Sequence, residues 1–416
     1  MFKGIFAILP ITVATAAAAA QPPAQPAPGP EQNIVVIGER LREFRERLAA
    51  CLARHCPPDE DIDASTALAE ALFVDGEYRE ARTVLRGSLD RNRGEAARYP
   101  EPVSDLYRAN ARVARHLGFD DDAQRSTWEI LRSLQAGLPQ EDHRHFTARL
   151  EIAESLTAFG QYRQAERELR ELAEVARAAG RDDIVATTEL RGLWVAYLQA
   201  PGGMLAVRRL TEMSASSDPY RSVGAKTLLV RIYNARGDHV RANALIESLG
   251  SGGTRRHLLY APAYQLAQQE DTGATGGRTS AIQTSIDRPP PPPGQAGVAS
   301  SLVTSNLADR LTDVYDDQLI DVGFRIKADG TVEDIQIVSR RGRSGWEQPL
   351  LRSMAGRRYS ATRDGSATYR VERYSYTSAR RTRDLTASRI ANRSPRGRLE
   401  FSLLSETVLP PAPAPR

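Results

Sequence analysis

Two patterns of apolar residues divide the chain into two regions. Over residues 39–250, apolar residues recur every three or four positions, as in Leu68 and Leu72, which is the spacing of amphipathic helices. Over residues 319–405, apolar and polar residues alternate with the period of β-strands. Residues 251–318 between them are rich in Gly and Pro and contain a five-proline run that favours polyproline II. We therefore predict a multidomain protein with an all-α region, a semi-flexible linker and a small α+β domain.

The helical region repeats a short motif in which a glycine precedes an aromatic residue and then an alanine. The three clear copies are spaced 42 residues apart, a weaker copy is expected at Gly202, and a further copy lacks the aromatic residue. The glycine is suited to a left-handed turn between two helices, and the alanine lets those helices approach closely. The motif residues are Gly76, Tyr78, Ala81, Gly118, Phe119, Ala123, Gly160, Tyr162, Ala165, Gly237 and Ala242. This pattern predicts about five helix–turn–helix units behind a leading helix over residues 39–55.

The Gly-x-Tyr-x-x-Ala pattern resembles the tetratricopeptide repeat. That repeat usually has a period of about 34 residues, so the interval in this chain predicts longer helices or connections. The resemblance implies an α-solenoid in which each unit buries one face against its neighbours. It also implies that peptides or proteins bind on the concave inner surface.

The alternating region is predicted to fold as β-β-α-β. Two strands flank the Asp329-Gly330 pair, a strong hairpin signal. A helix is expected between Gly345 and Gly356, and a third strand over Tyr369–Tyr376. Residues 388–404 are expected to add one more strand, before a proline-rich tail at 406–416.

Part of this region resembles the C-terminal domain of the TonB family of energy transducers. The resemblance rests on Phe324-Arg-Ile-Lys-Ala-Asp-Gly330-Thr-Val332 and on Ile335-Gln-Ile-Val338-Ser339. Ala361 stands where the family usually has proline, and the family's Tyr-Pro opening is missing at its expected distance. The resemblance implies binding of extended peptides by strand addition at an open sheet edge. It does not by itself imply energy transduction.

The N-terminus has the layout of a secretory signal peptide. Residues 1–20 combine Lys3, an apolar stretch and a run of small residues. The alternative is an uncleaved inner-membrane anchor, although the stretch is short and Pro10 interrupts it. We predict a periplasmic protein, with an anchored protein facing the periplasm as the alternative.

Residues 21–38 are predicted to be disordered or extended. Within them, the β-branched run Ile34, Val35, Val36 and Ile37 favours a strand and resembles a TonB box. One hypothesis is that this segment adds to a sheet edge. The alternative is a hydrophobic strand packed on the first helix.

Cys51 and Cys56 are the two cysteines of the chain. In an oxidising compartment an isolated pair of this kind is most often a disulfide. On a continuous helix the two would lie too far apart for a bridge, but Pro57-Pro58 ends the helix there and lets the last turn unwind. Free thiols and a metal site with His55 remain as alternatives, although no fourth metal ligand is evident.

The sequence predicts a binding protein and not an enzyme. The net charge of +4 over a chain with 26% charged residues argues against a nucleic-acid binder. The histidines are scattered, and no motif for a catalytic, cofactor-binding or metal-ligating site stands out. We predict a periplasmic adaptor or scaffold whose repeats bind a protein partner and whose sheet domain binds an extended peptide or an envelope protein. The alternative is a divergent TonB-type component of outer-membrane transport, with the TonB-dependent machinery as its partner.

Overall fold

A computed structural model gives the structure of the chain. It describes residues 30–200, 203–249, 251–252, 256–262, 265–267, 281–283, 318–342, 344–381 and 392–409.

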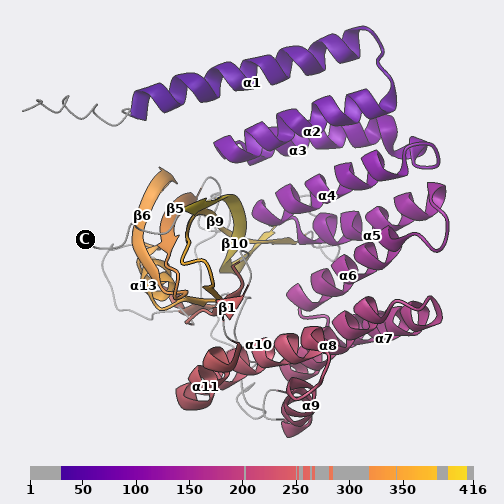
Figure 1. Cartoon of the computed structure of the whole chain (residues 1–416). Coiled ribbons are helices and arrows are strands. Elements are labelled where there is room, and N and C mark those ends of the chain that lie inside the picture. Colours follow the sequence, from indigo (N-terminus) through magenta and orange to yellow (C-terminus); the bar gives the residue numbers. More distant parts are fainter. Residues whose placement is uncertain are drawn as a thin grey trace, which may run out of the picture.

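Five helical hairpins follow a leading helix in the described part of the chain (Figure 1). The leading helix is α1 (Pro30–Ala53). The hairpins are α2 (Pro58–Asp75) with α3 (Tyr78–Asn92), α4 (Pro100–His116) with α5 (Asp120–Gly137), α6 (His143–Ala158) with α7 (Tyr162–Ala178), α8 (Asp182–Gln199) with α9 (Met204–Ser214), and α10 (Pro219–Ala235) with α11 (His239–Leu249). A short 3-10 helix, η1 (Arg93–Glu95), follows α3. The prediction of a TPR-like helical solenoid is thus confirmed.

The repeated motif forms the turn inside a hairpin. Gly76 has a φ of +84°, and the amide of Glu77 donates to the carbonyl of Leu72 at 2.8 Å, which closes the end of α2. The same left-handed glycine and the same bond recur in the α4–α5, α6–α7 and α10–α11 turns. The motif alanines are fully buried between their two helices; they are Ala81, Ala123, Ala165 and Ala242. The turn at Gly202 lies outside the described residues.

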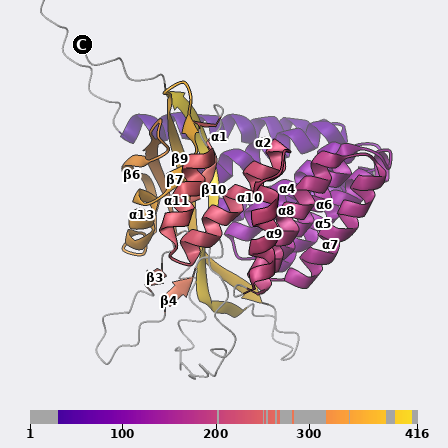
Figure 2. The same ribbon diagram turned by 60° about the horizontal axis from the view of Figure 1, so that its bottom comes forward.

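A four-stranded antiparallel sheet forms the C-terminal region, as the alternating pattern predicts. Its order is β10-β9-β5-β6. The strands are β5 (Leu319–Ile326), β6 (Val332–Arg341), β9 (Ala367–Arg381) and β10 (Asn392–Leu409). Helix α13 (Gln348–Ala355) covers the face remote from the hairpins, as Figure 2 shows. The predicted helix and the predicted last strand are both present, and β10 continues past residue 405 to Leu409.

Alternation along β5 sorts its side chains onto the two faces of the sheet. Ile320, Val322 and Phe324 point toward α13 and share a core with Leu350 and Met354. The intervening residue Leu319 belongs instead to the core of the first hairpins. Both faces of β5 are therefore buried, and the sheet is the middle layer between α13 and the repeats.

Two expectations about the connecting segments are wrong. Ile34, Val35, Val36 and Ile37 lie within α1 and not in an extended strand, so the helical region starts before residue 39. A strand at this point would need a partner to satisfy its backbone, whereas extending the following helix adds one hydrogen bond per residue.

The segment 251–318, expected to be a linker, contains four short strands among its described residues. They are β1 (Ser251–Gly252), β2 (Leu258–Tyr260), β3 (Gln265–Ala267) and β4 (Ala281–Gln283). β1 pairs with β8 (Ala361–Thr362), β2 with β7 (Arg358–Tyr359), and β3 with β4. The side chain of Arg256 is buried among the carbonyls of Ala328, Ser360 and Ser366. The start of this segment is thus part of the sheet region. The five-proline run lies outside the described residues.

Candidate protein-binding surfaces

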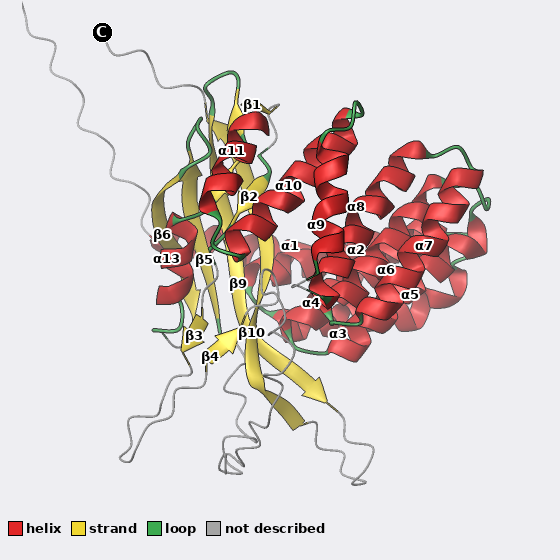
Figure 3. Cartoon of the chain, turned by 90° about the horizontal axis from the view of Figure 1, so that it is seen from below, coloured by secondary structure: helices red, strands yellow, loops and turns green. Residues whose placement is uncertain are grey.

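The sheet and the helical repeats pack against each other. Figures 1 and 3 place the sheet on one side of the stacked hairpins, with β9 and β10 toward the helices. Leu319 of β5 and Leu404 of β10 pack into the core of the first two hairpins. We call the sheet face that carries Leu319, Arg373, Ser375 and Ser402 the docking face. The prediction of two modules held apart by a semi-flexible linker did not include this contact.

A buried ion pair lies at the centre of the docking face. Arg373 of β9 binds both carboxylate oxygens of Asp321 on β5, at 2.6 and 2.7 Å. Its third nitrogen donates to the backbone carbonyl of Phe73, at the end of α2. Arg373 and Asp321 are almost fully buried. The arginine thus uses its fork of donors to bind a carboxylate of the sheet and a carbonyl at the buried end of α2 together.

His116 at the end of α4 makes a second buried polar contact between the helical repeats and the docking face. Its Nδ1 lies 2.9 Å from the hydroxyl of Ser375, and its Nε2 lies 2.9 Å from the hydroxyl of Ser402. Tyr78 shares a hydrogen bond of 2.8 Å with Ser375. Burial, reinforced by neighbouring arginines, holds the pKa of His116 well below its usual value. The ring is therefore neutral and accepts from one serine while it donates to the other.

The Ser375–His116 distance is that of a nucleophile and its general base, but the site does not suit catalysis. Ser375 is 2% exposed and His116 is 5% exposed. A substrate would have to separate the sheet from the repeats to reach either group. The arrangement serves to join the two regions.

Ion pairs surround this polar centre. Arg398 of β10 binds Asp120 at the start of α5 and Glu400 on its own strand, each at 2.7 Å. Arg115 of α4 binds Glu400 at 2.8 Å. Arg341 of β6 binds Glu77 in the first turn at 2.7 Å. The docking face is thus matched to the turns of the first two hairpins by charge as well as by shape.

The first two motif turns differ from the later ones in what they contact. A Cβ on Gly76 would lie 2.9 Å from Leu319, and a Cβ on Gly118 would lie 2.0 Å from the backbone oxygen of Ser378. At Gly160 and Gly237 no atom of the described residues would come within 4 Å of such a Cβ. The chain's own sheet therefore covers the first two turns and leaves the others uncovered within the described structure.

A hollow of about 540 Å³ opens between α8, α9 and α10. Six of its lining residues are Glu189, Gly192, Leu193, Arg209, Met213 and Arg221. Leu193 and Met213 are partly buried in the core of these hairpins. Arg221 binds Glu189 at 3.1 Å and Asp218 at 2.9 Å. We call this site the α8–α10 hollow.

Strand β6 forms one edge of the sheet. Its pairing within the described residues is with β5 on one side, and its Val338 is about half exposed. An edge of this kind offers unpaired backbone groups to another strand.

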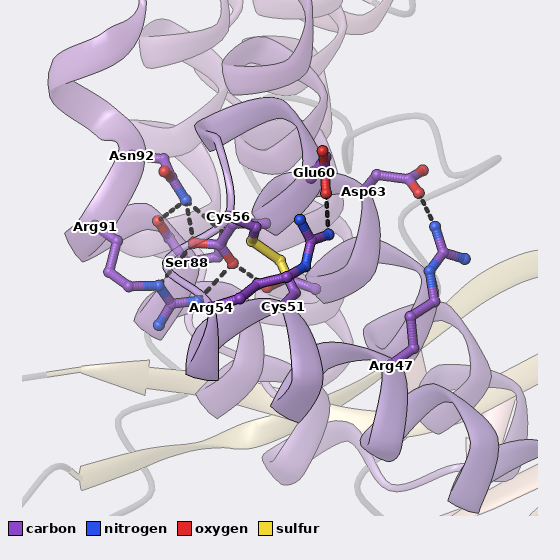
Figure 4. The surroundings of a disulfide bond; sticks show 11 residues. Arg47, Cys51, Arg54, Cys56, Glu60, Asp63, Ser88, Arg91 and Asn92 are labelled. Atoms are coloured by element: carbon purple, nitrogen blue, oxygen red, sulfur yellow. Dashed lines mark hydrogen bonds and ion pairs between the residues drawn. A yellow bond between two sulfur atoms is a disulfide. The ribbon is translucent and has the colours of Figure 1, made fainter.

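Cys51 and Cys56 are joined in a disulfide at the end of α1 (Figure 4). Their Cα atoms are 5.1 Å apart. Arg47 of α1 binds Asp63 of α2, and Arg54, just after α1, binds Glu60 of α2, so ion pairs beside the bridge also link the two helices. The disulfide and the ion pairs near it hold α1 against α2. Because both cysteines are used in the bridge, the alternatives of free thiols and of a metal site do not apply.

A buried carboxylate lies close to the bridge. Asp61 accepts hydrogen bonds from Arg91, Asn92 and Ser65. Burial by itself would raise the pKa of Asp61, but these bonds lower it below its usual value. The network holds the first hairpin together.

Neither a metal cluster nor a membrane span is found in the described residues. No three His, Cys, Asp or Glu residues there are grouped so that they could hold a metal ion. None of the described helices combines the length and apolar character that crossing a bilayer requires.

No family model matches the chain, and no curated protein matches it. Among solved structures, BtubC from P. vanneervenii is 19% identical with a TM-score of 0.36, covering 53% of this chain and 89% of that one. TPR-like repeats of a putative kinesin light chain from Podosopora anserina are 16% identical with a TM-score of 0.35, covering 46% and 94%. A Rap protein complexed with competence and sporulation factor is 14% identical with a TM-score of 0.33, covering 51% and 64%.

These likenesses extend over about half of the chain, and TM-scores of this size support no conclusion about partners. Nothing in them identifies the sheet region as a TonB-type domain.

Proposed function

We propose that this protein is a protein-binding adaptor of the cell envelope, in which the later helical hairpins bind the partner. The observation that carries the proposal is that the sheet covers some of the helical hairpins and leaves others open to a partner. The sheet covers the turns at Gly76 and Gly118, whereas the α8–α10 hollow stays open. The docked sheet stiffens the first two hairpins. Helix α10 also contacts the sheet region, where Arg231 lies 3.3 Å from the carbonyl of Leu258, but the residues that line the α8–α10 hollow all come from the hairpins themselves and offer the free surface. We infer no enzymatic activity.

Site-specific photo-crosslinking in cells tests this proposal. A photoreactive residue replaces Ala196, which is exposed on α8 one turn beyond Gly192 and on the same side of the helix. The control position is Arg86, exposed on α3. We expect a discrete adduct from Ala196 only, and the protein identified in it should bind the purified chain. Equal labelling from both positions, or none from either, would contradict the proposal.

The envelope location rests on residues 1–20, which lie outside the described structure. We propose that this segment is removed on export, so that the mature protein begins near Gln21. Intact mass of the protein purified from a periplasmic fraction tests this. A full-length protein in the membrane fraction would instead favour the anchored alternative.

A second candidate function is strand addition at β6, as expected of a TonB-like domain. The observation in its favour is the edge position of β6 in a four-stranded antiparallel sheet. A photoreactive residue at Val338 distinguishes the two candidates, because an extended peptide added to β6 would label from Val338 and not from Ala196. A TonB-type role in transport further requires that outer-membrane receptors be among the labelled proteins.

A further inference from the structure

Gly192 is the unusual residue of the α8–α10 hollow. It lies in the interior of α8, where glycine weakens a helix relative to alanine. Its backbone φ is not in the left-handed region, and a Cβ there would meet no described atom within 4 Å. Neither backbone geometry nor packing within the described chain therefore accounts for glycine at this position.

Gly224 on the facing helix α10 shows the contrast. A Cβ on Gly224 would lie 2.4 Å from the side chain of Leu190 on α8, so a larger residue there would have to displace that side chain. Gly192 faces open space instead. Its missing side chain widens the α8–α10 hollow, whose volume of about 540 Å³ lies within the range of ligand-binding pockets.

The lining of the hollow favours an apolar occupant. Leu193 and Met213 contribute apolar surface, and methionine adapts its shape to different ligands. The nearby charges are paired with one another: Arg221 binds Glu189 and Asp218, and Arg209 lies 3.5 Å from Glu212. The four charged residues that line the hollow itself, Glu189, Arg209, Glu212 and Arg221, are two of each sign, so the lining carries no net charge to select a charged ligand.

We infer that the α8–α10 hollow binds a large apolar side chain, of the leucine or phenylalanine kind, from a peptide segment of the protein partner. The side chain enters beside Gly192 and contacts Leu193 and Met213. The peptide's backbone then runs past the paired charges at the rim. This inference rests on the proposed function, since it specifies the chemistry of the partner at the site already described.

Methionine methyl NMR tests the hollow without the partner. The full sequence has four methionines. Met213 lines the hollow, Met354 is buried in the sheet core, and Met204 is exposed on α9. The full chain labelled at methionine methyl groups is titrated with N-acetyl-leucinamide and N-acetyl-phenylalaninamide, with N-acetyl-glycinamide as the control ligand. We expect a saturable shift of the Met213 signal with the two apolar probes, no shift with the glycine probe, and a constant Met354 signal.

Two variants at Gly192 complete the test. Gly192→Leu fills the hollow and should weaken probe binding by about tenfold or more, while an unchanged Met354 signal shows that the chain is folded. Gly192→Ala adds a single methyl group and should retain most of the binding. A Met213 signal that does not respond, that responds equally to all three probes, or that responds unchanged in Gly192→Leu would overturn the inference. In each of these cases a specific adduct from Ala196 would still support the proposed function, so the two failures can be told apart.

Discussion

The motif glycines share one backbone conformation but have different surroundings. Gly118 has a φ of +77° and lies against the backbone of Ser378, whereas Gly160 has a φ of +73° and faces open space within the described structure. Alanine at either position must adopt the left-handed region, which costs about 1–2 kcal/mol. Only at Gly118 would the new methyl group also push against the sheet.

We therefore expect Gly118→Ala to lower the free energy of unfolding by clearly more than Gly160→Ala. Urea unfolding of the two variants and of the unchanged protein measures the difference. Equal losses would mean that the sheet is not held against the second turn.

His116 makes the contact between repeats and sheet sensitive to acid. Because its pKa is well below the usual value in the folded protein, the unfolded chain binds the extra proton first as pH falls. The stability contributed by the neutral ring is thus fully present above about pH 6.5 and is lost below it, by at most about 1.4 kcal/mol per pH unit. The charged groups around the ring are Arg112, Arg115, Arg373, Arg398 and Glu400.

We expect the melting temperature to fall more steeply between pH 7 and pH 5 in the unchanged protein than in His116→Gln. Glutamine keeps a donor and an acceptor but does not titrate. Parallel curves for the two proteins would show that other groups cause the acid sensitivity.

The sequence predicted the residues of the motif but not those of the docking face. Gly76 and Ala81 are five positions apart, so a local pattern reveals them. His116 contacts serines 259 and 286 positions further along, and nothing near it in the sequence marks that role. The signal that existed was in β5, where both Ile320 and its neighbour Leu319 are apolar, as in a strand buried on both faces.

At the scale of elements, the disulfide fixes the end of the leading helix. Cys51 lies in the last turn of α1 and Cys56 precedes α2, while Leu41 packs α1 against the first hairpin. A bridge that closes so short a loop is expected to contribute about 2 kcal/mol in the chain-entropy account. Because few contacts other than α1–α2 depend on it, its loss should act locally.

We expect the double variant Cys51→Ala, Cys56→Ala to increase amide hydrogen exchange in α1, with α6 and α7 unchanged. The unchanged protein treated with a reductant should show the same difference. Increased exchange throughout the hairpins would contradict a local role.

The spacing of apolar residues predicted whether each long element is a helix or a strand. The predictions failed where a segment was too short to show a spacing, or where its composition suited both a strand and a helix. The run Ile34–Ile37 has a strand's composition but joins a helix of 24 residues. The strands β1 to β4 have two or three residues each, too few to show alternation. Their pairing partners lie in distant segments or in other short strands.

At the scale of the whole molecule, the sheet joins two layers. Its α13 face is an apolar core that encloses the buried Arg357–Glu372 pair, and its docking face is built around charged and hydroxyl groups. Polar groups removed from water stabilise a contact only when each has its partner. The docking face therefore specifies one arrangement of sheet and repeats. Breaking its central pair, Arg373–Asp321, should weaken the whole contact between the sheet and the repeats.

Arg373 provides the test of that unit. Arg373→Ala leaves Asp321 buried without its partner, a change that typically costs about 3–5 kcal/mol. Arg370→Ala is the matched control, because Arg370 lies on the same strand but binds Glu372 and Glu406 within the sheet.

Two signals report the two regions separately. Of the three tryptophans in the sequence, Trp346 lies in the sheet core. Replacing Trp128 and Trp194 by phenylalanine leaves Trp346 as the only tryptophan, so that its fluorescence reports on the sheet. Far-UV circular dichroism reports on the helices. If the docking face joins sheet and repeats into one cooperative unit, both signals should change at the same urea concentration in the parent protein and in Arg370→Ala. In Arg373→Ala, the Trp346 signal should change first, because the sheet no longer gains stability from the repeats. Coincident transitions in Arg373→Ala would show that the apolar contacts of Leu319 and Leu404 hold the two regions together without the buried pair.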